Sequence, residues 1–162
     1  YGYAWLLSAI AEANAFLDRE QVPSGAVVAL EADFSPRAVA MLLALAERSA
    51  VLVPLTSSVE SKKPEFREIA EVEYRLWIGE DDATGVESTG VRAAHPLITT
   101  LKGRGHPGLI LFSSGSTGKS KAALHDLVPM LEKFKVPRHT KRTITFLLFD
   151  HIGGFNTLLY NL

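Results

Sequence analysis

Apolar and polar positions follow three patterns along the first third of the chain. In residues 3–20 the apolar side chains recur every three or four positions, which predicts an amphipathic helix. Unbroken apolar runs at 26–30 and 51–53 predict buried strands. Between them, Ser35 is a typical N-cap and a proline follows it, so we expect a helix over 36–48. Strand, helix and strand in this order predict a βαβ unit with parallel strands.

The rest of the chain continues this alternation. Pro54 closes the second strand, and residues 80–90, with four carboxylates and two glycines, predict an acidic loop. The pair Asp81 and Asp82 could bind a cation there, but a solvated loop is the simpler interpretation. We expect further helices at 64–72, 95–101 and 126–135, and further strands at 74–78, 122–124 and 143–149. The fold class that follows is α/β, a mostly parallel sheet with helices on both faces.

The most distinctive segment begins where an apolar run at 109–112 stops. Residues 113–121 contain only serine, threonine, glycine and lysine. Glycines allow close approach of the backbone, hydroxyls and successive N–H groups can surround an anion, and lysines add charge. We therefore expect polyphosphate binding by Ser113, Ser114, Gly115, Ser116, Thr117, Gly118, Lys119 and Lys121. A flexible Gly/Ser linker is the alternative, but a linker need not follow a buried strand or carry two spaced lysines.

Composition narrows the classes of partner. The chain has 162 residues, of which 47% are hydrophobic, and this is enough for one core. Its formal net charge of −1 argues against a general nucleic-acid binder. It has no cysteine, and His95, His106 and His139 lack the spacing of a metal site, so we expect no metal held by protein ligands. No apolar run reaches the roughly 18 residues of a membrane span and no signal peptide is visible, so we expect a cytoplasmic protein.

Two families use loops of this kind. The Walker A pattern fits Gly118, Lys119 and Ser120, but it requires a glycine where this chain has Ser113. The segment 113–122 resembles more closely the phosphate loop of the acyl-adenylate-forming enzymes, which include acyl-CoA synthetases, luciferases and peptide-synthetase adenylation domains. It departs from that loop at Ser120, where the family usually has proline, and at Ala122, where it usually has glycine.

Two further stretches resemble the same family, in the family's order. The helix and strand at 35–57 end in a Val-Pro-Leu sequence at 53–55. Residues 149–154 resemble the motif in which a histidine precedes a glycine by three positions, here His151 and Gly154. The resemblance implies that residues 1–162 are a single, incomplete portion of a large N-terminal domain. We therefore expect a longer protein, in agreement with the missing initiator methionine and the apolar end.

The resemblance also implies an activity for that longer protein. It would join a carboxylic acid to ATP, giving acyl-AMP and pyrophosphate, and then form a thioester with coenzyme A. The residues of 113–121 named above would bind ATP with Mg²⁺, and His151 would lie near the acyl carboxylate and the thiol. The acid cannot be read from this portion: fatty or other aliphatic acids, aromatic acids and amino acids remain open, as does a carrier-protein thiol in place of coenzyme A. The portion alone is not expected to complete the reaction.

Two other functions are compatible with the sequence. A Walker A NTPase would release ADP and phosphate, and a domain that only kept the fold would serve interactions without catalysis. We also expect an exposed apolar segment at the C-terminus, through which two copies of the chain would associate. Its residues are Phe155, Leu158, Leu159 and Leu162.

Overall fold

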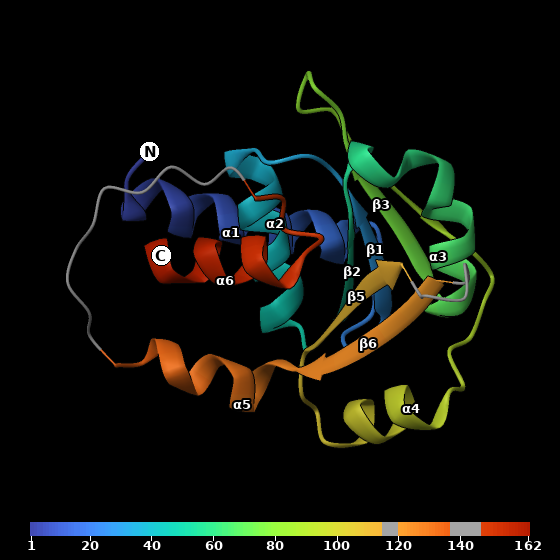
Figure 1. Ribbon diagram of the computed structural model, residues 1–162. Helices are drawn as coiled ribbons and strands as arrows, with labels where there is room; N and C mark the ends of the chain where they lie inside the picture. Colours follow the sequence, from blue (N-terminus) through green and yellow to red (C-terminus); the bar gives the residue numbers. More distant parts are fainter. Residues whose placement is uncertain (115–119, 137–146) are drawn as a thin grey trace.

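The computed structural model describes residues 1–114, 120–136 and 147–162, and Figure 1 shows the arrangement of its elements. From the N-terminus they are α1 (Tyr3–Arg19), β1 (Val27–Glu31), α2 (Pro36–Glu47), β2 (Val51–Leu55), the 3₁₀ helix η1 (Ser57–Lys62), α3 (Lys63–Ile69), β3 (Tyr74–Ile78) and β4 (Thr84–Ser88). They continue with α4 (Pro96–Gly103), β5 (Gly108–Ser114), β6 (Ser120–Asp126), α5 (Leu127–Leu131), the 3₁₀ helix η2 (Glu132–Phe134) and α6 (Ile152–Asn161).

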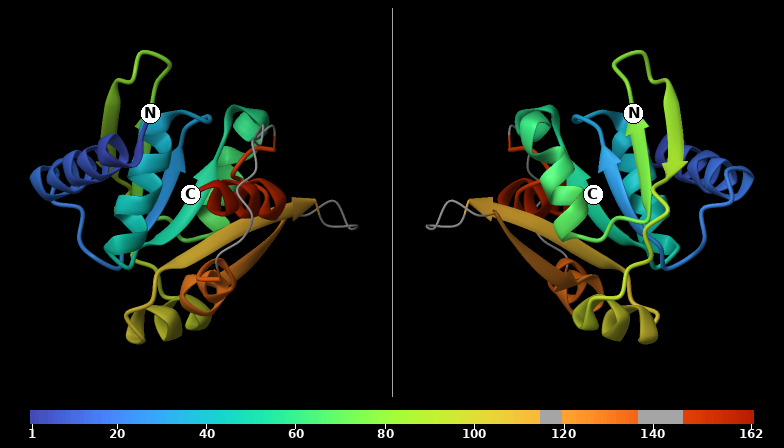
Figure 2. Two further views of the ribbon diagram at one scale, coloured as in Figure 1. Left: turned by 90° about the vertical axis from the view of Figure 1, so that its left-hand side faces the viewer. Right: turned by 90° about the vertical axis from the view of Figure 1, so that its right-hand side faces the viewer.

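The strands form one mixed sheet in the order β4-β3-β1-β2-β5-β6. The four inner strands are parallel, and β4 and β6 pair antiparallel with the strands beside them. Figure 2 shows this sheet from two opposite sides, with helices packed against it. The prediction of a mostly parallel α/β sheet is confirmed.

The predicted βαβ unit is β1, α2 and β2. Every residue of β1 and β2 is buried, as continuous apolar strands in the middle of a parallel sheet should be. The helix begins as expected, because the Ser35 hydroxyl accepts a hydrogen bond from the Ala38 N–H at 3.0 Å and Pro36 takes the first helical position. Local sequence and global topology therefore agree in this segment.

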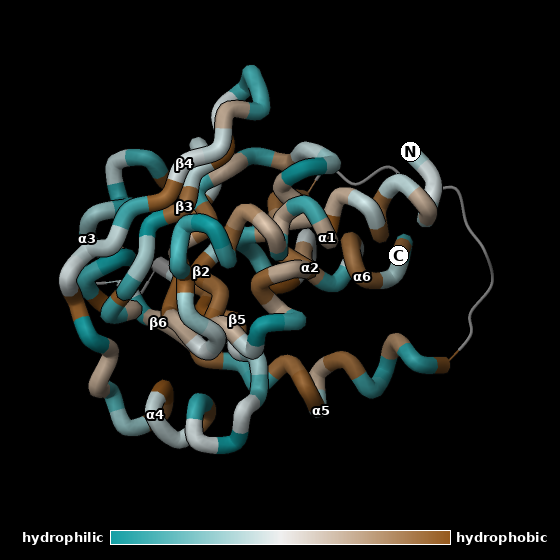
Figure 3. Tube along the Cα trace, turned by 180° about the vertical axis from the view of Figure 1, so that it is seen from behind, coloured by the Kyte–Doolittle hydropathy of each residue, from teal (hydrophilic) through white to brown (hydrophobic). Residues whose placement is uncertain are grey.

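Helices cover both faces of the sheet because side chains alternate along its strands. One core cluster contains Val28 and Leu30 of β1 with residues of α1, α2 and α6. The other contains Val27 and Ala29 of the same strand with residues of α3 and α4. Figure 3 shows hydrophobic segments where the inner strands and these helices meet.

The predicted end of the second strand at Pro54 is wrong. The strand β2 continues to Leu55, and Pro54 pairs in register with Leu30 of β1. The recorded pairing of β2 with β5 ends at Leu52, so the proline lies beyond the residues that need a ladder N–H on that side. A proline can therefore occupy an inner strand here.

The acidic segment 80–90 is not a loop throughout, because it contains the edge strand β4. Gly85 in this strand pairs with Trp77, and the indole ring fills the space that a side chain at position 85 would need. The glycine that suggested a loop therefore serves packing in a strand. Asp82 is half-exposed and pairs with Arg37 at 3.3 Å, in agreement with the solvated reading of the acidic pair.

The C-terminal apolar segment is more buried than expected. Phe155 and Leu158 are 1% and 7% exposed and belong to the core beside α1 and α2, so the expectation that they form an exposed surface is wrong. Leu159 packs partly buried against the same core, and Leu162 is exposed. Self-association through this segment stays a prediction with a smaller available surface.

Two further predictions concern a strand at 143–149 and membrane spans. Most of the predicted strand 143–149 lies outside the described residues, and its last three positions are not in a strand. Within the part of the chain that the structure describes, no helix has both the length and the apolar character that crossing a membrane requires.

Candidate functional site

The predicted phosphate-binding segment joins two strands of an antiparallel hairpin. Strands β5 and β6 pair from Gly108 with Asp126 up to Ser114 with Ser120, and Ser113 lies opposite Lys121. The side chains of Ser113 and Lys121 are exposed. The predicted residues between the strands, Gly115, Ser116, Thr117, Gly118 and Lys119, lie outside the described residues. The structure thus brings the two ends of the predicted segment together as neighbours on paired strands.

Helix α3 supports this hairpin. The rings of Phe66 in α3 and Phe112 in β5 are stacked, with their centroids 3.9 Å apart and their planes within 1°. One residue earlier in the helix, hydrogen bonds from Lys62 and from Ser120 lower the pKa of the Glu65 carboxyl. The start of β6 is therefore fixed to α3 by both apolar and polar contacts.

The predicted catalytic residue His151 lies at the start of α6. It takes the N-cap position without a capping hydrogen bond from its side chain, which is 60% exposed. Asp150, beside it in the sequence, is buried and accepts a hydrogen bond from the Thr56 hydroxyl at 2.6 Å. Thr56 directly follows β2, so this contact places His151 at the carboxyl end of that strand.

The segment formed by η1 and α3 connects these two places. It starts next to Asp150, where Ser57 and Ser58 follow β2, and reaches the hairpin at Glu65 and Phe66. Ser57 is held by its N–H, which donates to Asp33 at 2.8 Å. Among the contacts of the described residues, none joins His151 directly to Ser113 or Lys121.

All of these groups lie at the carboxyl edge of the parallel strands. In open α/β sheets, ligands bind at this edge, where consecutive strands depart to opposite sides. Here β2 lies on one side of β1 and β3 on the other. The segment after β1, with Asp33, and the segment after β2, with Thr56, flank that point.

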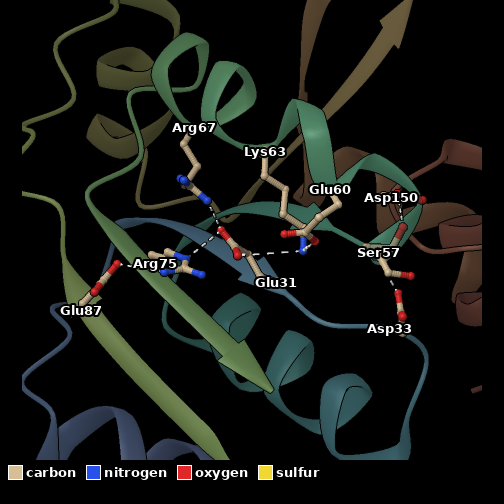
Figure 4. A network of polar contacts seen from close by, with 10 residues as sticks. Glu31, Asp33, Ser57, Glu60, Lys63, Arg67, Arg75, Glu87 and Asp150 are labelled. Atoms are coloured by element: carbon tan, nitrogen blue, oxygen red, sulfur yellow. Dashed lines mark hydrogen bonds and ion pairs between the residues drawn. The ribbon is translucent and has the colours of Figure 1, made fainter. Parts of the chain in front are cut away.

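A buried carboxylate at the same edge orders the segment after β2. Glu31, the last residue of β1, has a side chain only 4% exposed, and it pairs with Arg67 of α3, Arg75 of β3 and Lys63 (Figure 4). Burial opposes the charge of Arg75, but its hydrogen bonds with Glu31 and Glu87 raise the pKa of this guanidinium above its ordinary value. A buried carboxylate needs such partners, and here they tie α3 to the sheet.

Sequence reasoning did not single out Glu31, Thr56 or Asp150. Each had a signal that could have been used, namely a polar side chain at or just after the end of an apolar strand, or inside an apolar run. The parallel topology brings the residues after β1 and β2 to one edge of the sheet, but the return of Asp150 to that edge could not be read from spacing. Among the described residues, no cluster of three or more His, Cys, Asp or Glu side chains could hold a metal ion.

Two hollows of the surface, lined by described residues, lie away from these groups. One of about 200 Å³ is lined by α1, α2 and the hairpin of β3 and β4, with Trp5, Arg37 and Thr84 among its residues. Another of about 380 Å³ lies between the starts of α1 and α2 and the end of α6, where the Tyr3 hydroxyl donates to the Leu162 carbonyl. Neither is lined by the predicted site residues.

Neither a protein-family model nor a curated protein matches this chain by sequence. Solved structures do match. The N-terminal subdomain of NpsA from Klebsiella oxytoca, in complex with anthranilyl-AMSN, is 26% identical over 83% of this chain and 36% of that chain, with a TM-score of 0.61. An artificially fused adenylation-PCP di-domain NRPS from the same organism, NpsA-ThdA, is 26% identical over 76% of this chain and 27% of that one, with a TM-score of 0.57.

A third structure shares the fold over nearly the whole chain. The inhibitor-bound N-terminal domain of FACL13 from Mycobacterium tuberculosis has a TM-score of 0.68 over 98% of this chain and 47% of that chain, at 15% identity. The chain spans 33% to 38% of the length of three NpsA subdomain structures. These neighbours confirm the resemblance to the N-terminal part of adenylate-forming enzymes.

Proposed function

Since the chain is built like the N-terminal part of adenylate-forming enzymes, we propose that it supplies the phosphate-binding segment of a ligase that activates a carboxylic acid with ATP. The observation that carries this proposal is the β5–β6 hairpin at the carboxyl edge of a sheet shared with adenylation domains. The segment between its strands contains only glycine, hydroxyl and lysine residues.

The proposed first step is the attack of a substrate carboxylate on the α-phosphorus of ATP. The bond between the α-phosphorus and the bridging oxygen breaks, and pyrophosphate leaves with its negative charge. Backbone N–H groups and hydroxyls of residues 113–118 hold the β- and γ-phosphates, and Lys121 and Lys119 supply positive charge. Mg²⁺ would be bound by the phosphates of ATP and would neutralise part of their charge.

The proposed second step forms a thioester. A thiol attacks the acyl carbon, and AMP leaves. Coenzyme A and the thiol of a carrier protein are both compatible with the residues present, and in either case we propose that His151 lies near the acyl group. Fatty or other aliphatic acids, aromatic acids and amino acids all remain open as substrates, and the cytoplasm is the expected compartment.

The activity is proposed for a longer protein. We infer that residues 1–162 are an incomplete, single N-terminal portion of its AMP-binding domain, because they span about a third of the length of the structurally similar NpsA subdomains. The remaining parts would supply the adenine pocket and complete the acyl pocket, so the portion alone is not expected to turn over.

The geometry counts against the Walker A alternative. In that motif the glycine-rich loop leads from a strand into a helix, whose N-terminus holds the phosphates. Here Ser120, which would belong to the motif, begins the strand β6 instead. A non-catalytic interaction domain remains as a second alternative, and it differs from the proposal in having no acid-dependent use of ATP.

The nucleotide product distinguishes an adenylate-forming ligase from a Walker A NTPase and from an interaction domain. The longer protein is incubated with ATP, Mg²⁺ and a panel of aliphatic, aromatic and amino acids, and nucleotides are separated by chromatography. The proposal expects AMP, formed only when a suitable acid is present. Formation of ADP independent of any acid supports the Walker A reading, and the absence of both products supports the interaction domain.

A further inference from the structure

The side chain of Asp150 is buried, and among the described residues only one of its two carboxylate oxygens has hydrogen-bond partners. Its side chain is 4% exposed. One oxygen, Oδ2, accepts hydrogen bonds from the Thr56 hydroxyl at 2.6 Å and from the Ser58 hydroxyl at 3.3 Å. The other oxygen, Oδ1, is buried and has no hydrogen-bond partner among the described residues. Buried polar atoms are nearly always bonded, so an orphaned carboxylate oxygen calls for an explanation.

The imidazole of His151 lies near Oδ1. The distance from His151 Nε2 to Asp150 Oδ1 is 3.8 Å, which is beyond the range of a hydrogen bond, so the two groups would have to move together to form one. Hydrogen bonds of catalytic groups are often long without substrate and shorten when the complex forms. Thr56 and Ser58 hold Oδ2 at the end of β2, so Oδ1 is the carboxylate oxygen that is left to meet the ring.

We propose that Asp150 is a positioning residue that keeps the proton of His151 on Nε2, so that Nδ1 is the ring nitrogen that meets the substrate. The hydrogen bond made by one nitrogen of an imidazole decides which nitrogen carries the proton. In the neutral ring, Nδ1 is then a hydrogen-bond acceptor. Asp150 acts through His151 and does not itself contact the substrate.

This assignment rests on the proposed function and selects the thioester step for His151. The proton of the thiol passes to Nδ1, the sulfur forms a bond with the acyl carbon, and the bond between that carbon and the phosphate oxygen breaks. AMP leaves with the electron pair. The charged ring that results is stabilised by the Asp150 carboxylate, as a carboxylate orients and stabilises histidine in other acyl-transfer enzymes.

A purely structural role for Asp150 makes a different prediction. In that case its bonds to Thr56 and Ser58 would only tie the start of α6 to the end of β2, and the state of the His151 ring would not depend on the carboxylate. The two roles are separated by observing the ring nitrogens directly, without any activity.

The test is a long-range ¹H–¹⁵N spectrum of the histidine rings of the longer protein at alkaline pH. The His151 signals are assigned from a His151→Gln variant. The matched control is Asp126→Asn, because Asp126 is hydrogen-bonded to a different histidine, His106, at 2.9 Å. The proposal expects His151 to carry its proton on Nε2 and Asp150→Asn to abolish that preference. Asp126→Asn should alter the signals of His106 and leave those of His151 unchanged.

Unchanged His151 signals in a folded Asp150→Asn variant would overturn the proposal. If that variant does not fold, Thr56→Val removes the donor that orients Asp150 while keeping the shape of the side chain, and its His151 signals are read in the same way.

A kinetic measurement on the longer protein separates this proposal from the proposed function. Asp150→Asn should slow thioester formation about 100-fold more than it slows adenylation, the size of a general-base effect. Equal slowing of both steps contradicts the positioning role. A wild-type protein without adenylation contradicts the proposed function, and the ring spectrum still decides the pairing of Asp150 with His151.

Discussion

At the scale of single residues, Glu73 joins three separate parts of the molecule. Its carboxylate accepts hydrogen bonds from the Val27 N–H at 2.8 Å, the Ala93 N–H at 3.2 Å and the Lys102 ammonium at 2.9 Å. Burial opposes the charge, but these three donors together lower the pKa of Glu73 below its ordinary value. The start of β1, the segment before α4 and α4 itself therefore depend on one ionised carboxylate.

We predict that Glu73→Gln destabilises the chain by about 2 kcal/mol near neutral pH, the range for hydrogen bonds to charged groups. Because the folded-state pKa is lowered, the stabilisation is fully present above the ordinary value of about 4.3 and is lost as the pH falls through the folded value. The difference between variant and wild type should thus shrink in acid. Urea unfolding at neutral and acidic pH measures it, with the exposed Glu68→Gln as control. A difference that grows in acid would contradict this account.

Lys121 tests the proposed phosphate site. Its side chain is exposed on β6, opposite Ser113, and it matches the lysine of the family loop. In the longer protein, Lys121→Ala should weaken productive use of ATP by about 1.5–3 kcal/mol, the contribution of a hydrogen bond to a charged group. Steady-state kinetics of pyrophosphate release measure the loss, with the exposed Lys135→Ala as the matched control. Unchanged kinetics would remove Lys121 from the site.

The role of a residue could be predicted from the sequence where its partner lies only a few positions away. Ser35 is the predicted N-cap because its partner, Ala38, is three positions away. Asp150 could not be assigned in this way, because its partners Thr56 and Ser58 are more than ninety positions distant. Glu31 is a similar case, since three cationic partners from other elements make its burial possible.

At the scale of elements, helix α6 depends on a close backbone approach. Gly154, in its first turn, is buried, and a Cβ there would collide with the carbonyl group of Leu148. At the neighbouring Gly153, a Cβ would meet only the flexible end of the Leu147 side chain, at 3.2 Å. The packing therefore requires a glycine at position 154 but not at position 153.

We predict that Gly154→Ala destabilises the chain by about 1–3 kcal/mol, because backbone must shift to admit the methyl group. Gly153→Ala should be nearly neutral, since the higher helix propensity of alanine, about 1 kcal/mol, offsets a small adjustment of Leu147. Thermal or urea unfolding of both variants measures the contrast. Equal losses in the two variants would show that α6 does not pack as described.

Helices and buried strands of this chain could be predicted because their patterns are local. The third strand, Tyr74–Ile78, has the predicted bounds. The strand β4 was missed because Gly85 reads as a loop residue unless the indole of Trp77 opposite it is known. Pro54 was misread as a strand end for the same reason, because only the register shows that it needs no further ladder bond on the side of β5.

At the scale of the whole molecule, the parallel topology creates the candidate site. The carboxyl ends of β1, β2 and β5 lie at one edge, and they bring together segments that are distant in the sequence. The βαβ order predicted this sheet class, but nothing in the sequence pattern places β3 beside β1 instead of beyond β2. That choice sets the position where the strand order reverses, which is where ligands bind in such sheets.

We propose that this chain supplies part of the site that forms an acyl-adenylate. Acid-dependent exchange of labelled pyrophosphate into ATP, measured with the longer protein and the panel of carboxylic acids, tests it most directly. We predict exchange that requires one class of acid and is reduced by Lys121→Ala. Exchange that is absent with every acid, in a folded protein that binds ATP, would contradict it.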